Sequence, residues 1–120
     1  MNMIQSNVAG APLFLRVNYS LVKIDPADIL YIECADNYMK LHLKEGRPLL
    51  VRITLKALMT MLPEGFMRIH RSYVVALNQI SAIRNRSLKI GTSELPLGVS
   101  YEEPFMRRIK NSPTFGHAHY

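Results

Sequence analysis

The chain has 120 residues and a mass of 13.7 kDa, which fits one domain with a core of its own. Hydrophobic residues make up 48% of it and charged residues 20%, which excludes wholesale disorder. A single cysteine, Cys34, excludes an internal disulfide framework and a multi-cysteine zinc site. No apolar run approaches the roughly 20 residues of a membrane helix, and Met1–Pro12 lacks the features of a secretion signal, so we expect a cytoplasmic protein without a membrane partner.

The net charge is +6, from 15 Lys and Arg against nine Asp and Glu. A surplus of this size fits either a polyanionic partner or simple solubility, and the total alone does not separate the two interpretations. The distribution of the charges favours a binding face, because the stretch Phe66–Ser93 contains no acidic residue. This stretch contains His70 and the basic residues Arg68, Arg71, Arg84, Arg86 and Lys89.

The first elements in chain order are predicted to be short strands. Leu13–Tyr19 and Ser20–Ile24 form an expected hairpin that turns near Asn18. Asp28–Glu33 is apolar on both faces, which is typical of a central strand that is buried on both sides.

Tyr38–Lys44 alternates between apolar and polar residues, which predicts a strand with one buried and one open face. Glu45-Gly46 supplies a turn into a further strand, Pro48–Ile53. A helix follows, because Thr54 is a candidate N-cap and Pro63-Glu64-Gly65 is a stop signal. Its apolar residues have the spacing of an amphipathic helix: Leu55, Leu58, Met59 and Leu62.

After the helix the pattern returns to strands. They are expected at Phe66–Ile69, Tyr73–Leu77, Ile80–Arg84, Ser87–Ile90 and Glu94–Leu97. Asn85-Arg86 is a predicted tight turn. A second helix is expected after Ser100, since Ser100 and Glu103 have the spacing of a capping box and Pro104 then falls near the start of the helix.

The predicted architecture is therefore mostly β, with one or two short helices. We expect the domain to span residues 12–110, between a loose leader (1–11) and a frayed tail (111–120). His117 and His119 in that tail do not make a metal site, because no carboxylate or cysteine accompanies them, and no cofactor is expected.

No enzyme pattern is present in the sequence. Ser72 lies beside His70, but residues two apart seldom align for proton transfer and no orienting acid is close in sequence, so a non-catalytic interpretation is favoured. Cys34 ends an apolar strand without a neighbouring base or cation, which predicts a buried, inert thiol.

The segment Phe66–Leu77 is the most informative part of the chain, because it interleaves core residues with basic and hydroxyl side chains. Arginine offers paired donors for phosphate or guanine, and Ser72 and Tyr73 can hold phosphate oxygens. The structural alternative is that Arg68 lies along the sheet and that His70 is a satisfied core imidazole.

This segment, Phe-Met-Arg-Ile-His-Arg-Ser-Tyr-Val-Val, closely resembles the LytTR family of bacterial DNA-binding domains. Further matches are Asp28–Glu33 (Asp-Ile-Leu-Tyr-Ile-Glu), Asn37–His42 (Asn-Tyr-Met-Lys-Leu-His), Thr54-Leu55-Lys56, Leu62-Pro63, and Leu95-Pro96-Leu97-Gly98 followed by Tyr101. The resemblance covers Leu13 to Ile109. It implies a fold of small stacked antiparallel sheets whose loops, and not a recognition helix, enter DNA major grooves.

The resemblance places three DNA-reading segments at Asp36–Lys40, His70–Tyr73 and Gly98–Tyr101, with Arg71 at a base-contacting position. Arg68, Arg84 and Arg86 are added as phosphate contacts from their charge alone, and His70 either braces its turn or touches DNA. The complete set of expected DNA-binding residues is Asn37, Tyr38, Lys40, Arg68, His70, Arg71, Ser72, Arg84, Arg86 and Ser100.

Two departures from the family pattern bear on function. Family members usually carry a basic residue just after the third segment's Gly/Ser position, where this chain has Val99-Ser100. Members are also commonly fused to a receiver domain, for which these 120 residues leave no room, so we expect a stand-alone regulator or the output part of a longer one.

The sequence therefore predicts specific binding of double-stranded DNA in bacterial transcription regulation, with two copies as a possible dimer on DNA. A receiver domain or a sensor kinase pathway is a possible upstream partner. The alternative is a small β interaction module whose basic face binds a protein or RNA.

Overall fold

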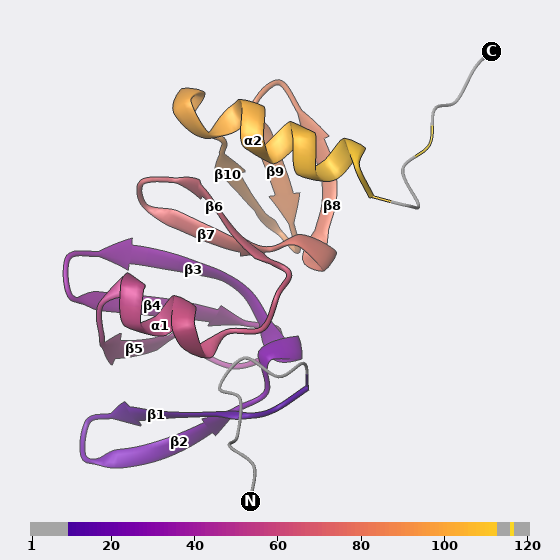
Figure 1. The fold of residues 1–120 in the computed structure, drawn as a ribbon. Coiled ribbons are helices and arrows are strands. Elements are labelled where there is room, and N and C mark those ends of the chain that lie inside the picture. Colours follow the sequence, from indigo (N-terminus) through magenta and orange to yellow (C-terminus); the bar gives the residue numbers. More distant parts are fainter. Residues whose placement is uncertain (1–9, 113–115, 117–120) are drawn as a thin grey trace, which may run out of the picture.

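The computed structural model describes residues 10–112 and residue 116, and the ten strands within them form three antiparallel sheets (Figure 1). The first sheet is a hairpin of β1 (Leu13–Val17) and β2 (Ser20–Ile24). Asn18 in its turn has a φ of 58°, a left-handed conformation that asparagine tolerates better than most residues. The expected hairpin is therefore confirmed, although its first strand ends at Val17 and not at Tyr19.

The second sheet has five strands in the order β5-β4-β3-β7-β6. Their bounds are β3 Ile29–Ala35, β4 Tyr38–Leu43, β5 Leu49–Arg52, β6 Phe66–His70 and β7 Tyr73–Ala76. The predicted central strand is confirmed as β3, which pairs with β4 on one side and with β7 on the other. Its start is corrected by one residue, because Asp28 belongs to a 3₁₀ turn, Pro26–Asp28, and the strand runs on to Ala35.

The third sheet has three strands in the order β10-β9-β8. Their bounds are β8 Ile80–Arg84, β9 Ser87–Ile90 and β10 Ser93–Pro96. Asn85 and Arg86 link β8 to β9 with φ angles of 50° and 57°, so the predicted two-residue turn is confirmed. This turn projects beyond the second helix at the top of Figure 1.

Two apolar cores join the three sheets. One contains Leu13 and Leu15 of the first sheet and Ile32 and Leu41 of the second. The other joins the second sheet to the third and includes Phe105, which is fully buried. The five-stranded sheet is thus covered on both faces at its middle strand, β3, which explains why that strand is apolar on both sides.

The first helix, α1 (Leu55–Met61), begins as the sequence predicts. Thr54 is its N-cap, and the Thr54 hydroxyl oxygen accepts a hydrogen bond from the Ala57 amide at 3.1 Å. Leu58 of this helix is fully buried in the first core.

The second helix, α2 (Val99–Lys110), corrects the predicted capping box. Its N-cap is Gly98, and Ser100 is the second helical residue and caps nothing. Pro104 consequently lies inside the helix, where its missing N–H leaves the Ser100 carbonyl without the usual partner four residues on. The reason is a tertiary bond: the Gly98 amide donates to the Ile69 carbonyl of β6 at 2.8 Å, and the helix starts directly after this anchor.

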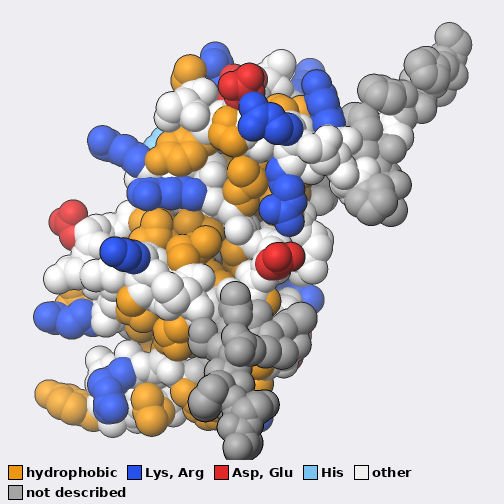
Figure 2. Space-filling view, in the orientation of Figure 1, with side chains coloured by type: hydrophobic (Ala, Val, Ile, Leu, Met, Phe, Trp, Pro, Cys, Tyr) orange, Lys and Arg blue, Asp and Glu red, His pale blue; other side chains and the backbone are white. Residues whose placement is uncertain are grey.

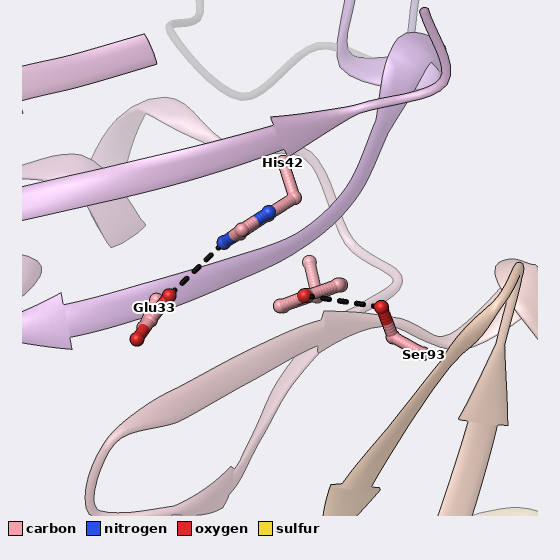
Figure 3. Close-up of polar contacts among 4 residues, drawn as sticks. Glu33, His42 and Ser93 are labelled. Atoms are coloured by element: carbon pink, nitrogen blue, oxygen red, sulfur yellow. Dashed lines mark hydrogen bonds and ion pairs between the residues drawn. The ribbon is translucent and has the colours of Figure 1, made fainter. Parts of the chain in front are cut away.

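Polar contacts supplement the cores where β3 meets its neighbours (Figure 3). The Tyr31 hydroxyl lies 3.4 Å from the Ser93 hydroxyl of β10, which connects the second sheet to the third. The His42 imidazole stacks on the Tyr31 ring at 4.2 Å, and its Nε2 lies 3.0 Å from Glu33 Oε1. The side chain of Glu33 is therefore engaged on the sheet face.

Candidate nucleic-acid interface

The three predicted reading segments lie at one end of the strands. The Asp36-Asn37 turn joins β3 to β4, the Arg71-Ser72 turn joins β6 to β7, and Gly98 begins α2. All three occupy the left side of Figure 1, and Figure 2 shows Lys and Arg side chains along the same side.

Main-chain hydrogen bonds hold these segments together. The Cys34 amide of β3 donates to the Ser72 carbonyl at 2.8 Å, which connects the strand before the first turn to the second turn. The bond from the Gly98 amide to the Ile69 carbonyl connects the second turn's strand to the start of α2. A Cβ on Gly98 would lie 3.0 Å from the Tyr101 ring and 3.6 Å from the His70 Cα, so the third segment packs closely against the second.

The Arg71-Ser72 turn is braced by side chains on both sides. His70 Nδ1 accepts a hydrogen bond from the Ser72 amide at 3.0 Å. The Arg68 guanidinium donates from Nε to the His70 carbonyl at 3.3 Å and from Nη2 to the Arg71 carbonyl. His70 therefore braces the turn, which was one of the two roles expected for it, and its Nδ1 engages the Ser72 backbone and not the hydroxyl.

The side chain of Arg71 takes no part in this bracing. It is exposed and makes no hydrogen bond or ion pair within the described residues. Between this turn and the Asp36-Asn37 turn lies an open groove of roughly 560 Å³ that Asp36, Arg68, Arg71 and Ser72 help to line. Arg71 therefore extends from a fixed turn, and no described residue occupies the donors of its guanidinium.

The three predicted residues of the first segment differ in their exposure and in their contacts. Asn37 is exposed at the tip of the turn. Tyr38 is 38% exposed, and its hydroxyl accepts a hydrogen bond from Arg52 Nη2 at 2.7 Å. Lys40 is half-buried, two residues further along β4, and stands opposite Glu33 of β3.

Arg84 and Arg86 are not brought together with the three segments. They line a separate groove of roughly 640 Å³ between the β8–β9 turn and α2. Arg86 Nη1 lies 3.8 Å from Glu102 Oε1 of α2, so its charge already has a partner in this chain. Arg84 is exposed and has no ion pair among the described residues.

The third segment is the first turn of α2 and not a loop, which corrects its expected form. Ser100 is exposed there, and Val99 is 73% exposed. No side chain caps this end of the helix, and the Tyr101 amide donates to the Gly98 carbonyl at 2.9 Å, so the amides of Val99 and Ser100 are the ones that lack an intrahelical acceptor.

Cys34 is half-buried and not fully buried as predicted. Burial raises the pKa of the Cys34 thiol; Arg68 acts against this shift, and Glu33 adds to it. The sequence shows no cation beside Cys34, because Arg68 comes close only through the pairing of β3 with β7 and β6. The thiol still stays protonated at neutral pH, which agrees with the predicted inert character.

In the part of the chain that the structure describes, no three His, Cys, Asp or Glu side chains are placed to hold a metal ion. His117 and His119 lie outside the described residues. Within the same described residues, no helix has both the length and the apolar character of a membrane span.

Comparisons with family models, with characterised proteins and with solved structures agree. The family model of the LytTr DNA-binding domain matches residues 19–110. The CO-responsive transcriptional regulator RcoM of Rhodospirillum rubrum is 32% identical over 63 residues, which are 52% of this chain and 27% of that protein's length.

A solved structure gives the third match and supports the fold. The LytTr DNA-binding domain of a putative methyl-accepting/DNA response regulator from Bacillus cereus superposes with a TM-score of 0.67. The match covers 80% of this chain and 94% of that one, at 22% sequence identity. With the family model matching well over half of its length, the chain belongs to the LytTR family of DNA-binding domains.

Proposed function

We propose that this domain binds double-stranded DNA sequence-specifically in bacterial transcription regulation, with its three segments in successive major grooves. The observation that carries the proposal is the braced Arg71-Ser72 turn, joined by main-chain hydrogen bonds to the strand before the first segment and to the start of α2. A rigid frame of this kind fixes the spacing between the reading segments, so DNA binding does not have to order their backbone.

The side chains divide into two kinds of contact. The Arg71 guanidinium can donate two hydrogen bonds to one guanine, at O6 and N7, and the Asn37 side-chain amide can form two hydrogen bonds with adenine. Lys40 has a compact ammonium, and Ser72 and Ser100 each have one hydroxyl donor; these groups suit phosphate oxygens and fix the domain on the duplex. Arg84 also remains a proposed phosphate contact, whereas Arg68 serves its own turn and acts by positioning Arg71.

The transcriptional setting comes from the regulators that the chain matches, of which RcoM is covered over only part of its length. Cytoplasmic location, dimerisation on DNA, and an upstream receiver domain or sensor kinase stay predictions from the sequence.

A salt titration tests the proposal. If six or more phosphates are contacted, the logarithm of the binding constant falls with the logarithm of salt concentration at a slope of about −5 or steeper. The measurement is a mobility shift or anisotropy titration on duplexes selected from a random pool, with unselected duplex as competitor. A slope near zero, or equal affinity for selected and unselected duplexes, contradicts specific DNA binding.

Arg68 provides a test of the bracing. Arg68→Lys keeps the charge but cannot donate to the His70 and Arg71 carbonyls in the same forked geometry. We expect specific binding to weaken by less than tenfold, with the salt slope unchanged, because the charge remains. A slope that falls by about 0.9 in Arg68→Ala but not in Arg68→Lys makes Arg68 a phosphate contact instead.

A further inference from the structure

One face of the five-stranded sheet is open to solvent at the end where it includes part of the first reading segment. We call it the β4–β5 outer face, and it consists of Tyr38, Lys40, His42, Leu50 and Arg52. Strand alternation puts these side chains on one side, while Met39, Leu41 and Val51 point into the first core on the other. Leu50 is 53% exposed and Arg52 is also exposed, so no described element covers this end of the face.

The position of Arg52 is fixed by Tyr38. The two residues stand opposite each other in the β4–β5 pairing. Arg52 Nη2 donates to the Tyr38 hydroxyl at 2.7 Å, and the guanidinium carbon lies 5.1 Å from the centre of the Tyr38 ring. The hydrogen bond and the cation–π contact together hold the Arg52 guanidinium against Tyr38, the residue that directly follows the Asp36-Asn37 turn.

No carboxylate of the described residues neutralises the charge of Arg52. Among the described residues, neither Arg52 nor Lys40 forms an ion pair with a carboxylate. Glu33 is the acidic residue paired across from Lys40, and its carboxylate contacts His42 (Figure 3). Lys40 and Arg52 are diagonal neighbours on the sheet, so the charge of Arg52 lies next to that of Lys40, the last residue of the first segment.

We infer that Arg52 is a further DNA-backbone contact and that Tyr38 is its positioning residue. The occupant of the β4–β5 outer face is then a phosphodiester stretch next to the major groove that the first segment reads, which extends the interface along the sheet. The inference rests on the proposed function. Two observations support it. Tyr38 orients the Arg52 guanidinium at the end of the sheet where the reading turns lie, and the guanidinium retains further donors for phosphate oxygens.

The test uses Arg52→Ala with Arg108→Ala as the matched control. Arg108 also carries an exposed charge, but it lines a groove with Phe66 and Ala76, at the ends of β6 and β7 away from the reading turns. Arg52→Ala should weaken binding several-fold to selected and unselected duplexes alike and reduce the salt slope by about 0.9. Arg108→Ala should change neither quantity, and thermal melting should show both variants folded.

Tyr38→Phe separates positioning from direct contact. In this variant the ring remains, but the hydrogen bond to Arg52 is lost. Tyr38→Phe alone should therefore show part of the loss of DNA affinity that Arg52→Ala shows. Adding Tyr38→Phe to Arg52→Ala should cause no further loss of affinity, because the Tyr38 hydroxyl then has no guanidinium to position. Full additivity of the two losses would show that Tyr38 contacts DNA on its own and would overturn its positioning role.

The outcomes separate this inference from the function on which it rests. If the wild-type domain binds selected duplexes but Arg52→Ala behaves like Arg108→Ala, the inference is wrong and the proposed function stands. If the wild-type domain does not bind duplex DNA, both are wrong. If Arg52→Ala keeps its DNA binding and loses binding to polyglutamate, the face takes an acidic protein segment, which also overturns the inference.

Discussion

Arg71→Ala is expected to weaken binding to the best duplex by about 1–3 kcal/mol and to reduce discrimination between selected and random duplexes. The reason is that Arg71 extends from a turn fixed by His70 and Arg68, while its own guanidinium bonds nothing within the described residues. An arginine that extends from a fixed turn with unbonded donors can form the paired bonds with guanine that identify a base. Binding curves for both kinds of duplex at one salt concentration measure the effect.

Arg86→Ala is the control for this experiment. Arg86 lies in another turn and is paired with Glu102 at 3.8 Å, so its removal should leave discrimination between duplexes unchanged. Any loss of affinity from it should be similar on all sequences, with a salt slope that flattens by at most about one unit. Circular dichroism must show both variants folded. Equal loss on selected and random duplexes for Arg71→Ala would remove Arg71 from base readout.

Most strands could be predicted because their burial pattern is local. β4 is buried at Met39 and Leu41, exposed at Tyr38 and half-buried at Lys40, as the alternation of the sequence requires. The start of α2 could not be predicted in this way. Ser100 and Glu103 have capping-box spacing, but the bond from Gly98 to Ile69 on a distant strand decides where the helix begins.

The same limit applies to the candidate site. Charge and spacing identify the basic stretch, and resemblance to the family identifies the three segments, yet neither shows how a given arginine is used. Arg68 holds carbonyls of its own turn, and Arg86 pairs with a helix that follows in sequence. Arg52 falls outside the acid-free stretch, and the signal for it is its register position opposite Tyr38. The partner of Arg52 is set by strand pairing and that of Arg86 by the packing of α2, whereas Arg68 bonds carbonyls only two and three residues away, which depends on the geometry of its turn.

The third segment raises the question of whether α2 still reaches DNA without a basic residue at its start. One possibility in the sequence is that Val99 packs beneath the helix, in which case a charge placed there would be buried and destabilising. The structure excludes this, because Val99 is 73% exposed at the first position of α2. Position 99 therefore accepts a polar side chain without loss of core packing, and a substitution there can test whether the start of α2 contacts DNA.

Val99→Arg is accordingly expected to fold normally, to bind duplex DNA several-fold more tightly, and to steepen the salt slope by about 0.9 for one added phosphate contact. Arginine has the better helix propensity, but a positive charge at a helix N-terminus is unfavourable by about 0.3–1 kcal/mol. These effects on folding are small and opposed, so one melting curve should show little change. Val99→Gln is the control, since it lengthens the side chain without adding charge and should leave the slope unchanged. If Val99→Arg is stable and its DNA affinity equals that of the wild type, the start of α2 does not lie in the interface, and the two turns of the five-stranded sheet read the DNA without it.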